Sequence, residues 1–401
     1  MEFNDPQLAP IWNKVQDHQR LDLGDVRQLY ASPDVIGVGW MAKQVKERRY
    51  GRKAFYVLNQ KLEPTNVCVL ACKFCDFATK RGRANAYEMS VEEMIARCQG
   101  DIQEIHISGG MPPEWTFDTY IELVRRLRAA FPTVAIKAFT AVEIEWAARI
   151  SKQSLDIALA RLKEAGLTAL PGGGAEVFSE RVRKALFPFK IGAKTWLEVH
   201  RTAHRLGIPS NATLLYGHIE TPEERWRHLE MLRALQDESL ANGPTLTRAA
   251  PFRRASPLPP GEGEGGVKAD RPPTEGEGSA AFMSFIPLAF QPGATGLAVR
   301  PPTMMDDLKM LAISRLYLDN FPHIKAYWVT LTPDLAQVAL RFGADDLDGT
   351  IVEERIIHGA GTPTERGMTR VEIEKLIRDA GRDPVERDTL YNSVQRISEL
   401  V

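Results

Sequence analysis

Residues 68–75 read Cys-Val-Leu-Ala-Cys-Lys-Phe-Cys and contain three of the four cysteines of this 401-residue chain. The thiols of Cys68, Cys72 and Cys75 are four and three positions apart, so one short loop can direct all of them at a single metal centre. A structural zinc ion usually has four protein ligands, whereas a cubane iron-sulfur cluster can be held by three thiolates with its fourth iron open. The stretch therefore favours an iron-sulfur cluster with one iron available for a further ligand.

Other interpretations of these cysteines stay open. A Cys-x-x-Cys pair also begins zinc knuckles and redox pairs, and neighbouring cysteines can simply pack as apolar side chains. His106 and His200 could assist the thiols in holding zinc. The fourth cysteine, Cys98, ends the amphipathic stretch 90–98, and we expect it to be a core thiol.

The composition indicates a protein of a reducing compartment. Fifty-one basic and 52 acidic residues are intermingled and give a net charge of -1, which does not predict a nucleic-acid surface. Four cysteines, three of them clustered, do not suggest a disulfide framework. The first 20 residues lack the apolar core of a secretion signal, and no apolar run is long enough to span a membrane. We therefore expect a cytoplasmic protein with no nucleic-acid or membrane partner.

Short β-rich stretches alternate with helical patterns along most of the chain. Strand, turn and helix repeated in this order predict a parallel sheet with right-handed crossovers, and hence an α/β fold of the (β/α) TIM-type barrel kind. The expected strands lie at 54–58, 104–108, 134–140, 167–170, 211–216, 282–290, 326–330 and 349–352. The expected helices lie at 90–98, 117–130, 154–165, 195–206, 222–236, 304–320, 333–342, 369–379 and 385–400.

The same patterns divide the chain into four segments. Residues 1–53 are expected to form an N-terminal helical lead-in, 54–239 the first part of the barrel, and 282–401 the barrel completion with C-terminal helices. Residues 240–281 contain Pro-Leu-Pro-Pro-Gly-Glu-Gly-Glu-Gly-Gly and scarcely any large apolar side chains. Such a composition buries too little surface to offset its ordering entropy, so we expect a disordered insertion.

Two glycine-containing motifs follow expected strands, at the barrel end where chemistry takes place. Ser108, Gly109 and Gly110 end the second strand, where glycine lets the backbone approach a ligand or simply turn. Glu176 closes the run Pro-Gly-Gly-Gly-Ala-Glu after the fourth strand. Its carboxylate could accept hydrogen bonds from ligand hydroxyls or begin a helix.

The spacing Cys-x3-Cys-x2-Cys, with Phe74 before its last cysteine, resembles the signature of the radical S-adenosylmethionine (radical SAM) superfamily. The resemblance implies that the three thiolates hold a [4Fe-4S] cluster whose open iron binds the methionine end of SAM. An electron from the cluster then frees a 5'-deoxyadenosyl radical. By the same resemblance, the SAM-binding residues are Phe74, Ser108, Gly109, Gly110 and Glu176. Many members carry an acidic or His-Pro sequence after the glycines, whereas Met111-Pro112-Pro113 follows here.

Further stretches at 170–176, 201–207, 211–224 and 343–350 resemble one group of radical SAM enzymes. The group comprises two futalosine-pathway enzymes of menaquinone synthesis and the synthase of a deazaflavin cofactor. Within it, residues 319–328 and 386–392 look most like the member that uses SAM as cosubstrate. In that reaction the adenosyl radical adds to 3-[(1-carboxyvinyl)oxy]benzoate, and rearrangement with loss of carbon dioxide gives 6-amino-6-deoxyfutalosine.

The resemblance leaves the catalytic side chains unassigned. His218 and Glu220 follow the fifth expected strand, and we include them with Arg183 and Arg201 as candidates for substrate binding. A small-molecule substrate and a reducing electron donor such as flavodoxin or ferredoxin are implied, and a homodimer is allowed. The alternatives are the cyclase acting on dehypoxanthine futalosine, the deazaflavin-cofactor synthase, and a non-catalytic iron-sulfur or zinc protein.

Overall fold

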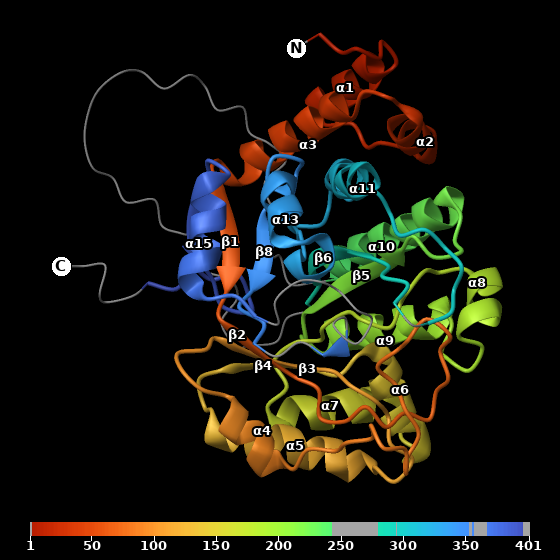
Figure 1. Ribbon diagram of the computed structural model, residues 1–401, viewed down its shortest axis with the longest axis vertical. Helices are drawn as coiled ribbons and strands as arrows, with labels where there is room; N and C mark the ends of the chain where they lie inside the picture. Colours follow the sequence, from red (N-terminus) through yellow and green to blue (C-terminus); the bar gives the residue numbers. More distant parts are fainter. Residues whose placement is uncertain (1, 243–279, 294, 353–354, 357–366, 396–401) are drawn as a thin grey trace.

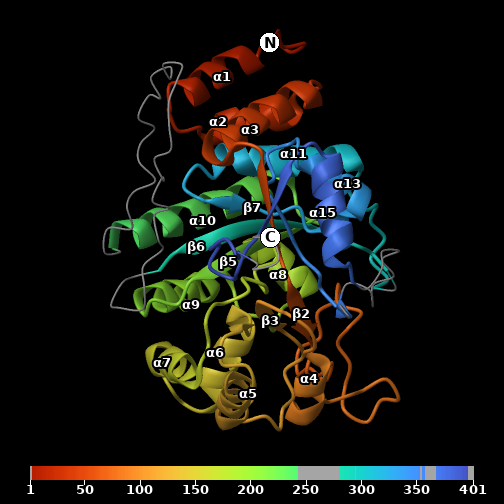
Figure 2. The same ribbon diagram turned by 90° about the vertical axis from the view of Figure 1, so that its left-hand side faces the viewer.

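The computed structural model describes residues 2–242, 280–293, 295–352, 355–356 and 367–395. Most of the predicted insertion, residues 243–279, therefore lies outside the described residues. So do residues 396–401, at the end of the last predicted helix. Figures 1 and 2 show the arrangement of the described elements in two perpendicular views.

The strands of the structure form one closed parallel barrel. β1 and β2 together make its first strand, which pairs with β8 on one side and β3 on the other. β3 pairs with β4, and β5 with β6 and then β7. Single bridges at Ala169 and Leu170 supply the fourth strand, and a bridge between Lys325 and Asp346 joins β7 to β8. The strands are β1 (Lys53–Val57), β2 (Asn59–Leu62), β3 (Glu104–Ile107), β4 (Ala135–Ala138), β5 (Ser210–Tyr216), β6 (Phe282–Ala289), β7 (His323–Ile324), β8 (Asp346–Gly349) and β9 (Asp383–Glu386). The predicted α/β fold, a TIM-type barrel, is confirmed.

Successive side chains of each strand point to opposite faces of the barrel wall. The outer positions are apolar and pack beneath the surrounding helices: Ile105, Ile107 and Ile136 are fully buried. The inner positions of the same strands include Glu104 and Lys137, which are joined by an ion pair of 2.5 Å. The barrel therefore has an apolar outer core and a polar lumen.

Helices surround the barrel, and several begin at residues whose side chains cap the first turn. Ser90 and Glu93 form a reciprocal capping box at α4, as do Thr140 and Glu143 at α6. The helices around the barrel are α4 (Val91–Arg97), α5 (Phe117–Ala130), α6 (Ala141–Ile150), α7 (Leu155–Ala165), α8 (Glu180–Leu186), α9 (Ala193–Arg205), α10 (Pro222–Asn242), α11 (Met304–Tyr317), α12 (Trp328–Leu331), α13 (Pro333–Ala339) and α15 (Arg370–Asp379). Three of them, α6, α8 and α12, were not predicted.

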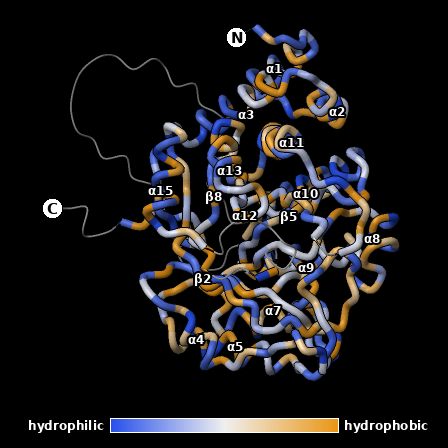
Figure 3. The backbone as a smooth tube through the Cα atoms, in the orientation of Figure 1, coloured by the Kyte–Doolittle hydropathy of each residue, from blue (hydrophilic) through white to orange (hydrophobic). Residues whose placement is uncertain are grey.

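The N-terminal helices α1 (Leu8–Gln16), α2 (Leu23–Ala31) and α3 (Val35–Tyr50) lie at one end of the molecule beside α11. The ammonium of Lys309 on α11 donates to the carbonyl oxygens of Tyr30 and Ser32 at 2.9 and 2.7 Å. Because α11 lies between these helices and the barrel, ten of its 14 residues are buried, and Figure 3 shows it as largely hydrophobic.

The predicted elements after residue 320 need three corrections. The strand predicted at 326–330 is displaced, because β7 ends at Ile324 and α12 covers much of that stretch. The last barrel strand is β8, slightly before the predicted 349–352. The helix predicted at 385–400 is wrong, because its first two residues belong to β9, which pairs in parallel with β1. The described residues beyond β9 form no helix. Pairing with a distant strand overrides the local helical pattern there.

The chain after β9 enters the amino-terminal end of the barrel. The guanidinium of Arg387 pairs with Asp346, the first residue of β8, at 2.6 Å. The hydroxyl of Thr389 donates to Glu104, the first residue of β3, at 2.8 Å. The ring of Tyr391 stacks on His323 with 3.6 Å between centroids. This C-terminal segment forms a floor at the amino ends of the strands.

Candidate active site

The cysteine loop begins shortly after β2, at the carboxyl end of the first barrel strand. Two of its amides form hydrogen bonds with other segments of the protein. The amide of Cys68 donates to the carbonyl of Thr79 at 3.0 Å, and the amide of Val69 donates to the carbonyl of Met111 at 2.9 Å. The ammonium of Lys80 donates to three successive carbonyl oxygens, those of Cys68, Val69 and Leu70, at 2.8, 3.1 and 3.0 Å. These bonds hold the first turn of the loop in one conformation.

The three thiols of the loop are free, Cys68 being buried and the other two half-buried. Burial raises the pKa of Cys72 to about 11, while the ammonium of Lys190 opposes that shift. Among the side chains that the structure describes, no three His, Cys, Asp or Glu residues are arranged around one metal ion. In a cubane cluster each thiolate binds a different iron, so the sulfur atoms stand farther apart than around a single zinc ion. The three thiols of one loop can supply one thiolate to each of three irons.

A cation lies beside the loop. The ammonium of Lys190 is 5.3 Å from the ring centre of Phe74 and 5.7 Å from that of Phe187, and the two rings meet edge to face at 5.6 Å. It also forms an ion pair with Glu176. Burial lowers the pKa of Lys190, but Glu176 and Cys72 outweigh burial, so the pKa ends above its ordinary value. Glu176, predicted to contact SAM, thus lies close to the loop with its carboxylate already paired.

The predicted glycine motif packs directly against the segment that leads to the cysteines. The amide of Gly110 donates to the carbonyl of Thr65 at 2.7 Å, and a Cβ added at Gly110 would lie 2.2 Å from the oxygen of Val67. Only glycine permits so close an approach. The amide of Gly109 donates at 3.2 Å to Glu143, a buried carboxyl group whose pKa burial raises to about 7. Ser108, the first residue of the motif, is buried beside them.

Glu143 was missed by sequence reasoning. The signal that could have found it is the spacing Thr140-x-x-Glu143 directly after the third predicted strand, which is typical of a capping box. Both oxygens of its carboxylate are used, one by Gly109 and the other by the amide and hydroxyl of Thr140. The residue therefore links the glycine motif to the start of α6.

The four residues predicted to bind substrate form ion pairs with nearby side chains. His218 and Glu220 lie 2.8 Å apart with fully buried side chains, and Glu220 also pairs with Arg225 at 2.7 Å. The guanidinium of Arg183 pairs with Glu180 and donates to the carbonyl of Pro188 at 2.7 Å, which holds the loop carrying Lys190. Arg201 pairs with Glu198 and Glu238 on the outside of α9. The structure does not bring the two arginines to the lumen.

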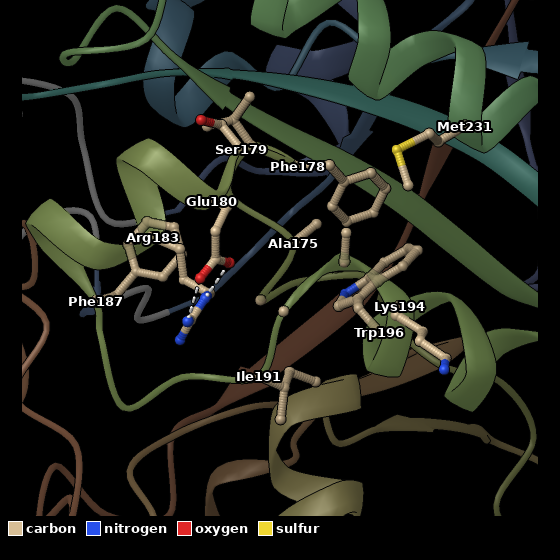
Figure 4. A pocket seen from close by; sticks show the side chains of 14 residues that line it. Ala175, Phe178, Ser179, Glu180, Arg183, Phe187, Ile191, Lys194, Trp196 and Met231 are labelled. Carbon is tan, nitrogen blue, oxygen red and sulfur yellow. Dashed lines mark hydrogen bonds and ion pairs between the residues drawn. The ribbon is translucent and has the colours of Figure 1, made fainter.

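A pocket of about 360 Å³ lies between α8, α9 and α10 (Figure 4). Phe178, Trp196 and Met231 form apolar walls, and the Glu180–Arg183 ion pair lies at its side. Neither the cysteines nor the lumen lysines contribute to its lining. The pocket nevertheless adjoins the cysteine loop, because Phe187 lines it and packs on Phe74.

The lumen below the cysteine loop carries ionisable side chains that sequence reasoning also missed. Lys137 pairs with Glu104, and Lys325 pairs with Asp348 at 3.1 Å. Burial works against ionisation of Glu104, but the cation of Lys137 holds its pKa down at about 2. The available signals were the strict alternation of polar and apolar residues in Glu-Ile-His-Ile, the sequence of β3, and the single lysine among apolar residues in Ala-Ile-Lys-Ala, the sequence of β4.

Comparison with known proteins agrees with this arrangement. Residues 62–232 match the Radical SAM superfamily, and residues 279–400 match the CofH/MqnC C-terminal region. Aminodeoxyfutalosine synthase of Thermus thermophilus is 45% identical to this chain over 98% of its length and 97% of that protein. Cyclic dehypoxanthine futalosine synthase of Streptomyces coelicolor is 33% identical over 96% of this chain and 88% of that protein.

A similar fold occurs in the solved structure of methylornithine synthase. The similarity covers 93% of this chain and 97% of that chain, with a TM-score of 0.67. At 15% identity, this similarity shows the fold alone. A parallel barrel with three loop cysteines beside a glycine turn defines the class of a radical SAM enzyme. The chain belongs to the radical SAM superfamily, in the family of the aminodeoxyfutalosine synthases. Enzymes of this superfamily use a [4Fe-4S] cluster and SAM. Within the described residues, no helix is both long and apolar enough to cross a membrane.

Proposed function

We propose that this protein catalyses the reaction of an aminodeoxyfutalosine synthase in menaquinone biosynthesis. SAM is the cosubstrate, and its 5'-deoxyadenosyl group is added to 3-[(1-carboxyvinyl)oxy]benzoate to give 6-amino-6-deoxyfutalosine with loss of carbon dioxide. The observation that carries this proposal is the 45% identity to the Thermus enzyme, which extends over 97% of that protein. The similarity to the cyclic dehypoxanthine futalosine synthase is lower, at 33%.

Cys68, Cys72 and Cys75 hold the cluster in this proposal. When bound, the cluster supplies the electron that cleaves SAM into methionine and the 5'-deoxyadenosyl radical. Lys80 keeps the first turn of the loop in place through its bonds to three carbonyl oxygens. The ring of Phe74, packed on Phe187, covers one side of the loop and helps to exclude water from it.

Backbone and side-chain groups at the ends of the second and fourth barrel strands contact SAM. We assign this role to Ser108, Gly109 and Gly110, whose close packing against residues 65–67 leaves their backbone beside the cysteine loop. Glu176 is held near the same place by Lys190. Its second carboxylate oxygen can accept hydrogen bonds from the ribose hydroxyls of SAM.

A small acidic one-electron carrier such as flavodoxin or ferredoxin supplies the electron. Three exposed residues near the cysteine loop support this partner: Lys73 within the loop, Lys184 on α8, and Phe189, whose side chain is 79% exposed. The amide of Lys73 donates to the carbonyl of Leu186 at 2.8 Å, so loop and α8 form one surface. Basic groups around an exposed aromatic ring suit an acidic partner. We place the enzyme in the cytoplasm, where thiols stay reduced; a homodimer stays a prediction.

The test is reconstitution of the cluster without oxygen, followed by incubation with a reductant, SAM and 3-[(1-carboxyvinyl)oxy]benzoate. Mass spectrometry should detect an adenosyl adduct of the benzoate that has lost carbon dioxide. Formation of 5'-deoxyadenosine alone would overturn the substrate assignment. Turnover of dehypoxanthine futalosine in its place would favour the cyclase. A colourless protein that contains zinc and leaves SAM intact would overturn the enzyme assignment.

A further inference from the structure

Three basic side chains lie in one row across neighbouring strands of the barrel. His106 on β3 is the register partner of Lys61 on β2 and of Lys137 on β4. Register partners on adjacent parallel strands are about 4.8 Å apart and share one face of the sheet. The intervening residues Ile105 and Ile136 are fully buried on the opposite face, beneath the helices. The row Lys61, His106 and Lys137 therefore faces the lumen.

His106 differs from the other histidines inside the protein. Within the described chain it makes no hydrogen bond, although its imidazole lies deep in the barrel. The buried rings of His200, His204 and His228 each bond to a hydroxyl or a backbone group at 2.7–3.1 Å. His106 is half-buried on the lumen face, so its unbonded ring nitrogens are open to a ligand in the barrel.

The surroundings of His106 favour an anion. Burial lowers the pKa of His106 well below its ordinary value, and Lys137 and Lys61 lower it further, whereas Glu104 and Asp348 act less strongly in the opposite direction. The ring is therefore neutral and retains one N–H to donate. The two ammonium groups on either side of it dominate the local field, which would stabilise a negative charge placed between them.

Two carboxylates lie beside the lysines of the row. Glu104 is held below the row by Lys137 at 2.5 Å and by the hydroxyl of Thr389 at 2.8 Å. Glu63 forms an ion pair with the ammonium of Lys61 at 3.7 Å. An ammonium has three N–H groups, so the pairing of Lys137 with Glu104 leaves it able to bind a second acceptor.

The position of the row suits the reaction. His106 precedes Ser108 of the glycine motif by two residues, a rise of about 7 Å along a strand. The C-terminal segment forms the floor on the other side, through Arg387 and Tyr391. A molecule whose acidic end lies at the row would extend its other end toward the cysteine loop.

We propose that Lys61, His106 and Lys137 form a carboxylate-binding row that anchors the ring carboxylate of the benzoate substrate, with the enolpyruvyl group directed toward the cysteine loop. This inference rests on the proposed function and adds the residues that position its substrate. The same chemistry could bind the carboxylate of the SAM methionine, so the test must separate these two sources.

The test measures binding to the reconstituted protein, without reductant, by anaerobic calorimetry. The ligands are 3-[(1-carboxyvinyl)oxy]benzoate, its analogue 2-phenoxyacrylate, which lacks the ring carboxylate, and SAM. The variants are Lys61→Met, His106→Leu, and the double variant Lys137→Met with Glu104→Gln, which leaves no unpaired carboxylate. Lys46→Met is the matched control, because Lys46 is a fully buried lysine outside the lumen that donates to carbonyl oxygens of residues 51 and 53.

We expect each row variant to bind the benzoate about ten- to a hundredfold more weakly, as for loss of a charge-assisted hydrogen bond. Affinity for 2-phenoxyacrylate and for SAM should change less than about threefold, and Lys46→Met should keep all three affinities. The assignment would be overturned if a row variant bound the benzoate normally. It would also be overturned if a row variant lost affinity for the benzoate and for 2-phenoxyacrylate equally. Loss of affinity for SAM would assign the row to SAM, and this result would also overturn the assignment to the benzoate. If the wild-type protein neither bound nor converted the benzoate, the proposed function itself would fall.

Discussion

The ammonium of Lys190 and the carboxylate of Glu176 form a buried ion pair beside the cysteine loop. Lys190 reaches this place from the loop after α8, and Glu176 from the end of the fourth barrel strand. The pair thus ties together the two ends of the connection that runs from this strand through α8 to α9. The same ammonium lies over the ring of Phe74, so one cation contacts both the predicted SAM-binding carboxylate and the loop that carries the thiols.

Replacing Lys190 with Met should lower activity about ten- to a hundredfold, the usual effect of losing an outer partner of a metal site. Removing a cation near the cluster disfavours the added electron, so the midpoint potential should become more negative. Iron content should stay unchanged. An EPR-monitored redox titration measures the midpoint potential. In Lys190→Arg the shift should be smaller than in Lys190→Met, because the positive charge is kept. Lys375→Met is the control, because Lys375 is 73% exposed on α15, away from the cysteine loop. An unchanged potential in Lys190→Met would contradict this role.

Each of the three loop cysteines should be needed for the cluster. Ala variants of Cys68, Cys72 and Cys75 should lose most of the bound iron and all SAM cleavage, since a three-thiolate site has no spare ligand. Cys98→Ala should keep its iron and lose about 1 kcal/mol of stability, because Cys98 is a buried core thiol. Iron analysis and the absorbance of the reconstituted protein measure the outcome. Full iron content in any loop variant would remove that cysteine from the ligand set.

Gly110→Ala should weaken SAM binding and lower the free energy of unfolding by about 1–3 kcal/mol, as for overpacking of a rigid site. The reason is that the new Cβ would lie 2.2 Å from the carbonyl oxygen of Val67, a backbone atom that cannot rotate away. Gly192→Ala is the control, because the nearest atom to its added Cβ is 3.8 Å away in the side chain of Arg183. Urea unfolding and SAM titration test both effects. A variant as stable as the control would contradict the close packing.

Glu143 should make stability depend on pH. Burial raises its pKa to about 7 in the folded protein, above the ordinary value of 4.5. Between these two values the folded state holds a proton that the unfolded state has released. The contribution of Glu143 is therefore fully present below about pH 4.5 and is lost as the pH rises through about 7.

The measurement is urea unfolding of the wild-type protein and of Glu143→Gln between pH 4.5 and 8. Relative to the variant, the wild type should lose about 3 kcal/mol across this range, the free energy of a shift of this size. Subtracting the two curves cancels the other titrating groups. Parallel curves would show that the carboxyl group of Glu143 is ionised in the folded protein throughout.

The floor of the barrel should depend on Arg387. Arg387→Met leaves the buried carboxylate of Asp346 without its cation, and breaking a buried pair from one side costs about 3–5 kcal/mol. Arg378→Met on α15 is the matched control, because the side chain of Arg378 is 58% exposed and its pair with Glu374 should contribute less than about 1 kcal/mol. Thermal unfolding compares them. Equal melting temperatures would mean that the C-terminal segment adds no stability to the barrel.

Much of the fold was predictable because its signals are local. The alternation of strand and helix patterns identified the barrel, and the helix predicted at 117–130 coincides with α5. The capping pair Ser90 and Glu93 marked the start of α4 for the same reason, since both partners lie within one turn. The helix predicted at 385–400 was wrong because β9 is formed by pairing with β1, more than 300 residues earlier.

The sequence by itself determined the class of site at residues 68–75, because three thiols in one loop need only a short stretch of chain. Only the tertiary structure decided which groups surround that loop. Lys190 meets Glu176 across α8, and the register of three strands places His106 between Lys61 and Lys137. A local pattern states that a side chain faces the lumen, but the partner on the neighbouring strand depends on how the whole barrel closes.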